Sequence, residues 1–467
     1  MITFGTDGWR GVISEDYTFN NVRLVSEAYA NYIIERGEAD KGIVVGFDAR
    51  FLSEEYAKDC AAVLSDKGIK VWLTSHLVPT PALSWQVVDH NAAGGVMITA
   101  SHNPARYNGL KIKSSFGGPA SPEIIEDVEG YVRILEKSDS SFPKIDLTSK
   151  VEIFDPRQGY IDHIKALLDE KLLSEYKGKI VFDAMHGSGQ GYISALAKDY
   201  NLDLIEVRGD YNPSFGGVNP EPIEKNLEAL KEVMFKNNAQ VGLATDGDGD
   251  RIGAMDPDGT FINANQIIAL LTKYLVEHKG WSGAVVKTVT VSELVTKVAE
   301  KYGLKVYETP VGFKHIASLM LTDDIMIGGE ESGGIGIKNY IPERDGVLLG
   351  YLLIEMVAFY KKSLGQILNE MMDELGYVYY RREDLVIEHD RKTKLMKKLI
   401  EDTPTTFDGE PVLRYSCKDG CKMYLSDGWL IFRASGTEPI VRIYAEFPSV
   451  ERLSKVMKGA VSYAKNF

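Results

Sequence analysis

Cysteine is scarce in this sequence, which excludes a fold held together by disulfide bonds. The chain of 467 residues contains three cysteines, Cys60, Cys417 and Cys421. Small secreted folds use a larger and even set of cysteines. Cys417 and Cys421 have no histidine or further cysteine close to them in the sequence, so their spacing does not predict a zinc site.

Positive charge is also in short supply. The chain has 53 Lys and Arg residues against 67 Asp and Glu residues, and its formal net charge is -14. Nucleic acids and anionic membranes select basic protein surfaces, so we expect neither as a partner. A phosphorylated small molecule needs only a local basic pocket and is compatible with this charge.

Long apolar runs are missing as well. The longest, residues 347–360, contains Glu355 and is too short to span a bilayer. The first residues, MITFGTDGWRG, lack the basic start and the apolar core of a signal peptide. We therefore expect a cytoplasmic protein with no membrane partner.

Nucleotide-binding motifs are absent too, because no P-loop pattern occurs. The segment HGSGQG at residues 186–191 follows an apolar run, as a dinucleotide fingerprint would. Tyr192 stands where that fingerprint needs its third glycine. We interpret the segment as a tight turn between a strand and a helix.

What the sequence does contain is a repeated alternation of strand-like and helix-like segments. Residues 42–47 and 69–74 have the apolar character of buried strands, and residues 53–67 between them have helical periodicity. Such alternation indicates βαβ units and a largely parallel sheet. The same plan begins again at residues 179 and 284, which indicates a weak architectural repeat.

Beyond residue 376 the pattern changes, with strand-like runs at 429–433 and 440–446 and a closing helical pattern at 450–465. We therefore predict an α/β fold of three similar domains with mixed, mainly parallel sheets, followed by a C-terminal α+β domain. Polar connections give domain boundaries at residues 1–148, 149–254, 255–374 and 375–467.

Three aspartates, Asp246, Asp248 and Asp250, alternate with glycines in one short segment, DGDGDR. Glycine allows the backbone to turn tightly, so the three carboxylates can converge on one hard cation. An EF-hand loop is excluded, because Arg251 stands where that loop needs glycine and Pro257 where it needs glutamate. A solvated acidic turn is the alternative, but carboxylates this close together repel one another.

Three further loops follow strand-like runs and carry polar groups. Ser101, in TASHNP, is a candidate nucleophile, although a serine that caps its own turn is the alternative. GGEESGG at residues 328–334 suits the recognition of sugar hydroxyls, although a plain flexible turn is favoured on this segment alone. RASGTEP at residues 433–439 forms either an anion-binding cradle or a capping turn.

These four loops, in this order, resemble the α-D-phosphohexomutase family, which includes phosphoglucomutases, phosphomannomutases and their amino-sugar relatives. The resemblance covers the whole chain and implies four domains around a central cleft. The segments that carry it are GTDGWRG at 5–11, TASHNP at 99–104 with YNG-x-K at 107–111, DGDGDR at 246–251, GEES at 329–332 and R-x-SGTEP at 433–439.

The resemblance also implies roles for individual residues. Ser101 carries the transferable phosphate, and this group completes a Mg²⁺ site formed by Asp246, Asp248 and Asp250. The implied residues around the reacting phosphoryl group are Arg10, His102, Lys111 and Arg251. The implied sugar contacts are Lys314, Glu330 and Ser332, and the implied holders of the phosphate that does not react are Arg433, Ser435, Gly436 and Thr437.

The implied reaction interconverts hexose 1-phosphate and hexose 6-phosphate through a hexose 1,6-bisphosphate. Lys111 or His102 could serve as the general base, whereas Gly334 replaces a histidine found in some relatives and cannot. Glu331 matches the loop of glucomutases, so we expect glucose phosphate as the substrate, with mannose phosphate second and glucosamine phosphate as an alternative. A metal-dependent sugar phosphatase and a phosphosugar-binding sensor are the rival classes. We expect a monomer or a homodimer.

Overall fold

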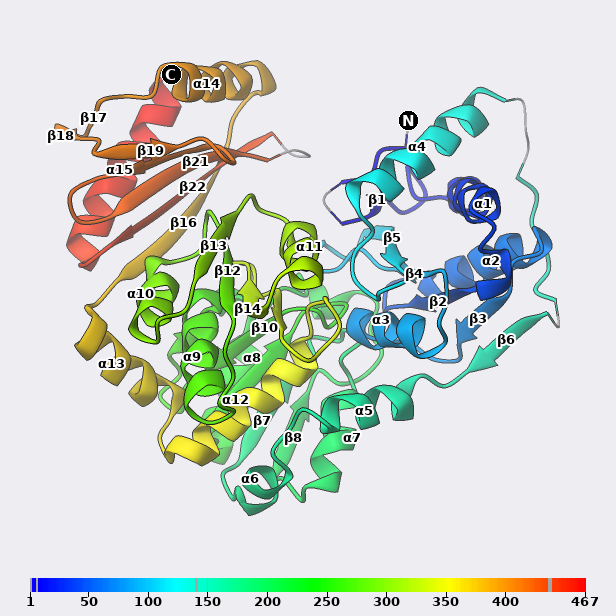
Figure 1. Cartoon of the computed structure of the whole chain (residues 1–467), viewed down its shortest axis with the longest axis horizontal. Coiled ribbons are helices and arrows are strands. Elements are labelled where there is room, and N and C mark those ends of the chain that lie inside the picture. The colour runs from blue at the N-terminus through cyan, green and yellow to red at the C-terminus, as the bar shows by residue number, and fades with distance from the viewer. Residues whose placement is uncertain (1, 6, 139–141, 149, 436–438) are drawn as a thin grey trace.

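Four domains follow one another along the chain in the computed structural model (Figure 1), which describes residues 2–5, 7–138, 142–148, 150–435 and 439–467. The first three contain mixed sheets covered by helices, and the fourth contains an antiparallel sheet. The predicted fold class, three α/β domains and a C-terminal α+β domain, is confirmed. Within the described ranges, no helix combines the length and the apolar character needed to cross a membrane.

The first domain has a six-stranded sheet in the order β1-β5-β4-β2-β3-β6. Its central strands are parallel, and β1 and β5 are antiparallel to their neighbours. Its elements are β1 (Trp9–Val12), α1 (Phe19–Glu35), the 3-10 turn η1 (Ala39–Lys41), β2 (Ile43–Phe47), α2 (Ser53–Asp66), β3 (Val71–Thr74), α3 (Thr80–Asp89), β4 (Gly94–Ile98), β5 (Tyr107–Ser114), α4 (Pro122–Lys137) and β6 (Val151–Phe154).

The second domain has a five-stranded sheet in the order β11-β10-β9-β7-β8, parallel between β9, β7 and β8. Its elements are α5 (Arg157–Lys165), α6 (Glu170–Glu175), β7 (Ile180–Asp183), α7 (Tyr192–Asp199), β8 (Leu204–Val207), η2 (Phe215–Gly217), η3 (Glu224–Asn226), α8 (Glu228–Asn237), β9 (Val241–Thr245), β10 (Ile252–Met255) and β11 (Phe261–Ile262).

Two of the predicted domain boundaries fall too early. Residues 151–154, placed in the second domain, form β6, which pairs in parallel with β3 of the first sheet. Residues 261–262, placed in the third domain, form β11, which pairs with β10 of the second sheet. In each case the strand after a polar connection covers an otherwise open edge of the preceding sheet. A polar linker therefore marks an exposed connection here without marking the end of a domain.

The third domain has a four-stranded sheet in the order β13-β12-β14-β15. Its strands β12, β13 and β14 are parallel, and β15 returns antiparallel to β14. Its elements are α9 (Ala264–Glu277), β12 (Ala284–Thr288), α10 (Glu293–Lys301), β13 (Val306–Thr309), α11 (Phe313–Thr322), β14 (Ile325–Gly329), β15 (Ile335–Ile337), α12 (Gly346–Tyr360) and α13 (Leu364–Leu375).

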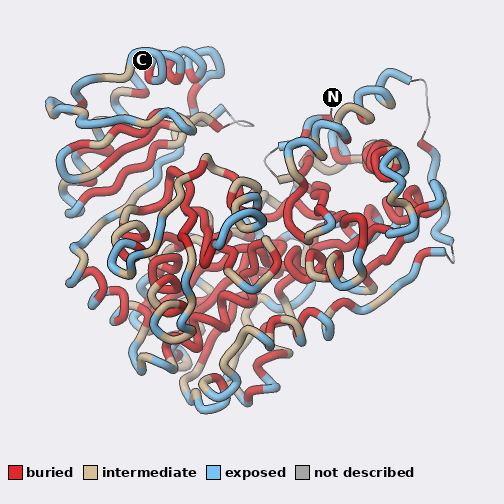
Figure 2. The backbone as a smooth tube through the Cα atoms, in the orientation of Figure 1, coloured by how far each residue is buried: buried red, intermediate tan, exposed pale blue. Residues whose placement is uncertain are grey.

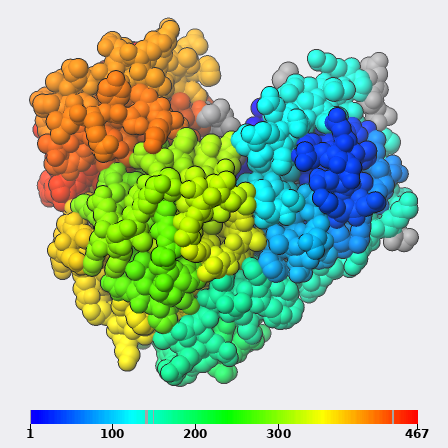
Figure 3. Space-filling view, in the orientation of Figure 1, coloured from blue at the N-terminus to red at the C-terminus, as the bar shows by residue number. Residues whose placement is uncertain are grey.

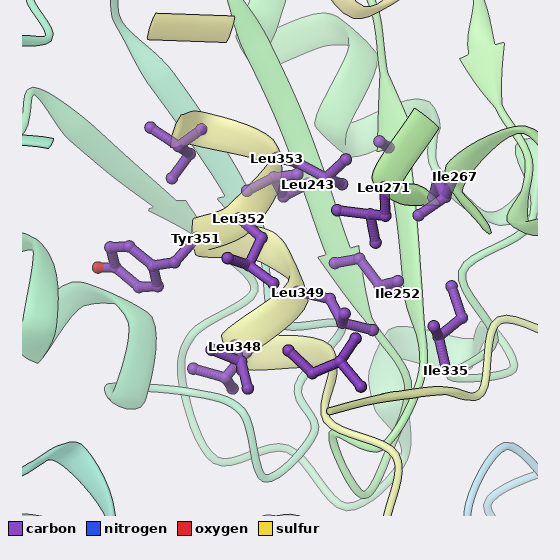
Figure 4. Close-up of a cluster of buried hydrophobic side chains, with 14 of the residues drawn as sticks. Leu243, Ile252, Ile267, Leu271, Ile335, Leu348, Leu349, Tyr351, Leu352 and Leu353 are labelled. Carbon is purple, nitrogen blue, oxygen red and sulfur yellow. The ribbon is translucent and has the colours of Figure 1, made fainter. Parts of the chain in front are cut away.

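Helix α12 joins the second and third domains through one hydrophobic core. Every residue from Gly346 to Val357 is buried, as expected for a helix that is apolar on all sides. Figure 4 shows its leucines on one side of Leu243 and Ile252 of the second domain, with Leu271 of the third domain on the other side, and all belong to one cluster. The two domains therefore form one packed unit, and α12 begins beside the DGDGDR loop, where Gly346 N donates to the carbonyl oxygen of Gly249 at 3.0 Å.

The fourth domain has its own core beneath an antiparallel sheet in the order β16-β22-β21-β20-β19. Figure 2 shows the buried layer of this domain, and Figure 3 shows a notch in the surface between the fourth domain and the first. A second, small cluster of Val289 with Trp429, Ile431 and Tyr444 packs this sheet against the third domain. The elements of the fourth domain are β16 (Tyr379–Val386), α14 (His389–Glu401), β17 (Thr406–Phe407), β18 (Glu410–Pro411), β19 (Arg414–Ser416), β20 (Cys421–Tyr424), β21 (Trp429–Ala434), β22 (Ile440–Phe447) and α15 (Val450–Asn466).

Candidate active site

Ser101 lies in the loop between β4 and β5, and its backbone is held in an unusual conformation. Its φ is +52°, a value that non-glycine residues rarely adopt without support from their surroundings. Its backbone N–H donates to Thr99 Oγ1 at 2.8 Å, and the Thr99 hydroxyl donates to Asp48 Oδ2 at 2.6 Å. This chain of hydrogen bonds directs the Ser101 side chain away from the first sheet.

Arg50 supports the same loop by binding its backbone carbonyl groups, a role that the sequence did not reveal. Its guanidinium donates to the carbonyl oxygens of Asn103 at 2.7 Å and Tyr107 at 2.9 Å, and also to that of Ser101. Asp48 pairs with its Nε at 3.2 Å, and both side chains are fully buried. A buried arginine with a paired carboxylate thus satisfies the carbonyl groups of a loop that has no regular structure.

The three aspartates of DGDGDR lie between β9 and β10 and are fully buried. One oxygen from each of Asp246, Asp248 and Asp250 lies within 4.8 Å of the others. The backbone N–H groups of Asp250 and Arg251 donate to Asp246 Oδ1 at 3.0 and 3.2 Å. The loop closes on its own first carboxylate, which brings the three acids together as the alternation with glycine predicts.

The HGSGQG segment forms the predicted turn between β7 and α7, and it packs against the DGDGDR loop. Ser188 N donates to the carbonyl oxygen of Gly247 at 2.9 Å. A Cβ at Gly187 would lie 2.7 Å from the carbonyl oxygen of Asp246, so only glycine allows this approach. The glycines of this segment thus support the aspartate loop.

The serine loop and the aspartate loop meet across the boundary between the first two domains. Ser101 Oγ donates to Asp246 Oδ2 at 2.8 Å. A Cβ at Gly247 would lie 2.4 Å from the carbonyl oxygen of Ser101, so the two backbones are also in close contact. Thr80, at the start of α3, donates to Asp248 Oδ2 at 2.6 Å.

Two cations balance the charge of the aspartates, and only Lys111 was predicted. Lys111 Nζ lies 2.8 Å from Asp248, 3.0 Å from Asp250 and 2.9 Å from Asp7. Arg344 Nη2 lies 2.7 Å from both Asp7 and Asp250. Asp7 belongs to the GTDGWRG segment, which could have revealed it. Arg344 directly precedes the capping residue of α12 and has no comparable signal.

Burial and charge shift the protonation of these groups in opposite directions. Burial raises the pKa of Asp246 well above its usual value, and repulsion from the neighbouring carboxylates adds to this shift. Burial also acts to raise the pKa of Asp248, but the Lys111 ammonium outweighs it and lowers that pKa. Burial and the nearby cations Arg251 and Arg10 lower the pKa of His102.

The aspartate cluster has the donors that a hard divalent cation requires. Asp248 Oδ1 and Asp250 Oδ1 are buried, and neither has a hydrogen-bond partner in the described part of the chain. An unpaired buried carboxylate oxygen is costly unless a cation or a donor approaches it. Three all-oxygen ligands fit Mg²⁺, Mn²⁺ or Ca²⁺. The cluster could therefore hold such a metal ion.

The remaining predicted residues of the reacting side lie around this cluster. Arg10 Nη1 donates to the side-chain oxygen of Asn103 at 2.6 Å, within the serine loop. Arg251 Nε lies 3.8 Å from Asp246 Oδ2, and this nitrogen has no hydrogen-bond partner among the described residues. His102 Nδ1 is buried and is also without a partner in the described ranges. The structure thus brings all five predicted catalytic residues to one place.

The GEES loop lies next to the aspartate loop, through a β-bridge between Arg251 and Gly334. Glu330 accepts a hydrogen bond from Gly312 N at 2.9 Å. Burial raises the pKa of Glu330 to about 7, against the opposing effect of Arg344. A Cβ at Gly334 would lie 2.4 Å from Arg344 Cδ, so a larger residue here would require the Arg344 side chain to move.

Other predicted sugar contacts are less tightly held. Ser332 is partly exposed at the tip of the GEES loop, and Lys314 is partly exposed in the first turn of α11. Lys314 directly follows the segment that contacts Glu330 through Gly312. The GEES loop borders the aspartate loop, but no hydrogen bond or ion pair within the described residues joins Ser332 or Lys314 to the aspartates.

The predicted phosphate-holding residues lie in the fourth domain, at the end of β21. Arg433 Nε donates to Asp419 Oδ2 at 2.8 Å, and the Ser435 carbonyl oxygen accepts from Lys392 Nζ at 2.9 Å. Gly436 and Thr437 lie outside the described residues. Across the described ranges, no hydrogen bond or ion pair joins Arg433 to the serine or aspartate loops, so the structure separates this group from the reacting side.

The fold and the site together define a four-domain α/β protein in which a buried serine meets a cluster of three carboxylates. Family models described as phosphoglucomutase/phosphomannomutase match this chain in four consecutive parts. They are alpha/beta/alpha domain I at residues 1–138, domain II at 158–259, domain III at 263–375 and the C-terminal domain at 385–461. The chain belongs to the phosphoglucomutase/phosphomannomutase family.

Individual relatives agree on the family but carry different substrate names. A phosphoglucomutase/phosphomannomutase of Thermococcus kodakarensis is 31% identical over 97% of this chain and 96% of its own. A probable phosphoglucosamine mutase of Thermococcus gammatolerans is 31% identical over 99% and 98%. The crystal structure of a putative phosphomannomutase from Thermus thermophilus is 36% identical, covers 99% of both chains and has a TM-score of 0.88.

Proposed function

We propose that this mutase interconverts hexose 1-phosphate and hexose 6-phosphate through a phosphorylated Ser101 and a hexose 1,6-bisphosphate. Glucose phosphate is the favoured substrate, and mannose phosphate is the second. The observation that carries the proposal is the contact of Ser101 Oγ with Asp246 across the domain boundary, at 2.8 Å. A phosphate on Ser101 would lie beside the three carboxylates, where a cation could neutralise it.

In this proposal Asp246, Asp248 and Asp250 hold Mg²⁺. When bound, the ion supplies positive charge at the phosphoryl oxygens and leaves a coordination position for the phosphate on Ser101. The unpaired oxygens of Asp248 and Asp250 support this assignment. Lys111 and Arg344 reduce the net charge of the cluster, so that the aspartates remain together before any cation arrives.

Arginine side chains complete the reacting side. Arg251 and Arg10 lie beside the serine and aspartate loops and would pair with the phosphoryl oxygens during in-line transfer. Of the two residues predicted as general base, Lys111 donates to three carboxylates and has no lone pair to accept a proton. His102 is therefore our candidate for removing the proton of the sugar hydroxyl.

A second anion site explains how one cleft can phosphorylate both ends of a hexose. We assign the sugar hydroxyls to Glu330, Ser332 and Lys314, which border the aspartate site. The phosphate that does not react would bind the end of β21 in the fourth domain. Turning the bisphosphate end for end then exchanges the two phosphates between the sites. The assigned holders of this phosphate are Arg433, Ser435, Gly436 and Thr437.

The amino-sugar alternative also has support, because several relatives are named phosphoglucosamine mutases. Glu331 is the residue that led us to prefer glucose. It accepts a hydrogen bond from Thr290 at 2.6 Å, which holds its carboxylate beside the segment after β12 of the same domain. Initial rates on glucose, mannose and glucosamine 1-phosphates, measured side by side with purified enzyme, decide between these substrates. A glucosamine rate above the other two would overturn the preference.

Ser101→Ala tests the chemistry itself. We expect turnover to fall by about three orders of magnitude or more, because removing a nucleophile removes the covalent path. The melting temperature should stay within a few degrees, and Ser138→Ala, on an exposed serine of the same domain, serves as a control. Near-normal activity of Ser101→Ala would reject the mechanism. Release of inorganic phosphate from glucose 1-phosphate at the rate of substrate loss would instead indicate a metal-dependent phosphatase.

A further inference from the structure

The turn between β19 and β20, residues 417–420, connects the fourth domain to the third. Lys418 Nζ donates to the carbonyl oxygen of Glu308 at 3.2 Å. Asp419 Oδ2 accepts from the backbone N–H of Val311 at 2.9 Å. The turn therefore contacts the end of β13 and the segment that leads into α11. The proposed sugar contact Lys314 lies in the first turn of that helix.

The same carboxylate oxygen also holds Arg433. Arg433 Nε donates to Asp419 Oδ2 at 2.8 Å. Among the described residues, Asp419 is the only hydrogen-bond partner of the Arg433 side chain. Gly420 makes this approach feasible, since its φ is +89° and a Cβ there would lie 2.3 Å from the carbonyl oxygen of Phe432. The turn thus lies directly against the backbone of β21.

An arginine whose Nε is bound in this way keeps its two terminal nitrogens for another ligand. These nitrogens form the fork that matches two phosphate oxygens, and their direction is set once Nε is held. Without a partner for Nε, the side chain would sample several rotamers and lose part of that order on binding. The carboxylate therefore determines where the fork points.

The residue after Val311 extends the connection to the GEES loop. Val311 N donates to Asp419, and Gly312 N, one residue later, donates to Glu330 Oε1 at 2.9 Å. Two adjacent N–H groups thus link a carboxylate of the fourth domain and a carboxylate of the GEES loop. The Val311–Gly312 segment therefore joins the turn that holds Arg433 to the GEES loop.

We propose that Asp419 is a positioning residue, which orients the guanidinium of Arg433 toward a phosphate of the substrate. The same carboxylate connects Arg433 to the Val311–Gly312 segment beside the GEES loop. This inference rests on the proposed function, in which Arg433 holds the phosphate that does not react. Asp419 itself touches neither phosphate nor sugar.

The test compares Asp419→Ala and Asp419→Asn with the wild-type enzyme, using glucose 1-phosphate as the variable substrate. We expect Asp419→Ala to raise KM about tenfold and to change kcat less than twofold, because a charge-assisted hydrogen bond outside the reacting centre is lost. Asparagine retains an oxygen that can accept both hydrogen bonds, so Asp419→Asn should raise KM by less than about threefold. If the alanine variant melts early, its KM is measured at a temperature at which it stays folded, and a KM equal to that of the wild type there would overturn the proposal.

A second background separates positioning from simple domain docking. Arg433→Lys has no Nε–H fork to orient, so Asp419→Ala should raise KM no further in that background. An equal rise in both backgrounds would show that Asp419 acts on docking and would overturn the proposal, as would a fall in kcat at constant KM. If Arg433→Lys alone leaves KM unchanged, the assignment of Arg433 fails. That result would count against the proposed function itself, and not only against the role of Asp419.

Asp427→Ala is the matched control. Asp427 lies in the turn between β20 and β21, at the far end of the same sheet, and it also accepts from an arginine Nε, that of Arg452, at 3.1 Å. We expect its removal to leave KM and kcat within twofold of the wild type. A tenfold rise in KM for this control would mean that any lost ion pair in the fourth domain disturbs binding, which would contradict a specific role for Asp419.

Discussion

The proposed reacting side and the proposed phosphate-holding side of this enzyme are built in different ways. Ser101 and the three aspartates are buried, and they are held by contacts from the first, second and third domains. Arg433 belongs to a domain with its own core, and its side chain is held by one carboxylate, that of Asp419. One side is assembled in advance, and the other depends on where the fourth domain lies.

This difference matches what each side must do. Phosphoryl transfer gains most from groups that are fixed before the substrate arrives, because they need no reorganisation during the reaction. Holding the far phosphate requires only binding, and a bisphosphate that turns end for end needs room to do so. The third and fourth domains meet through polar contacts, like those of Lys422 and Asp419, and through a small apolar cluster of Val289 with Trp429, Ile431 and Tyr444. Such a junction allows relative movement more readily than the large hydrophobic core shared by the second and third domains.

Metal removal is the most severe way to break the reacting side. After dialysis against EDTA we expect kcat to fall by about a thousandfold, since three close carboxylates would then repel the phosphate. Added Mg²⁺ should restore activity and raise the melting temperature, because a ligand that binds only the folded state stabilises it. Asp248→Asn should lose most of both responses, whereas Asp258→Asn, in an exposed turn, should keep them. Full activity in excess EDTA would refute the metal assignment.

Much of this picture could be predicted from the sequence, because short-range patterns carried it. Alternation of strands and helices gave the α/β class, and the glycines of DGDGDR indicated that its aspartates converge. The contact between Ser101 and Asp246 was also expected, through the resemblance of the four loops to a known family. The first two predictions depend on residues that are close together in the chain, whereas the contact between Ser101 and Asp246, 145 positions apart, was reached only through the resemblance.

The rest depends on residues that are far apart, and local patterns do not report it. Asp7 and Arg344 are separated by 337 positions, yet they form one ion pair at the aspartate site. Nothing near Arg50 in the sequence distinguishes it from other loop arginines. Its role depends on the carbonyl groups of the serine loop, which come close to it only in the folded chain. The β6 strand was assigned to the wrong domain because a polar linker cannot show which sheet has an open edge.

The second prediction concerns the holding side, through Lys422. Its Nζ donates to the carbonyl oxygen of Val289 at 2.8 Å and lies 4.2 Å from the centre of a Trp429 ring, between the third and fourth domains. We expect Lys422→Met to raise KM for glucose 1-phosphate by about threefold to tenfold, because it loosens the domain that carries Arg433. Chemistry on the reacting side should continue at the wild-type kcat.

Steady-state kinetics check this, with Lys398→Met as the control, since Lys398 lies on the exposed helix α14 and pairs only with Asp402 among the described residues. A variant with normal KM and a lowered kcat would reverse the expected division between the two sides. Combined with metal removal, the result would show whether the two halves of the site can be damaged independently.

The smallest predicted effect tests the packed junction behind the reacting side. Asp345, which caps α12, is buried and accepts hydrogen bonds from Tyr340 at 2.7 Å and Tyr160 at 2.9 Å. Burial raises the pKa of Asp345 to about 6, against the opposing effect of these donors. The group therefore stabilises the fold when it is protonated, and this contribution disappears as the pH rises through about 6.

The expected change between pH 5 and pH 7.5 is about 1 kcal/mol for a fully buried group with this shift. Asp345→Asn cannot titrate, so its melting temperature relative to the wild type should improve by about 2 °C over that interval. Asn263→Ala removes the uncharged cap of α9 and should cost the same at both pH values. A constant difference for Asp345→Asn would show that this carboxylate is ionised in the fold at pH 5. Its hydrogen-bond donors, Tyr340, Tyr160 and the backbone N–H of Leu348, would then outweigh the effect of its burial.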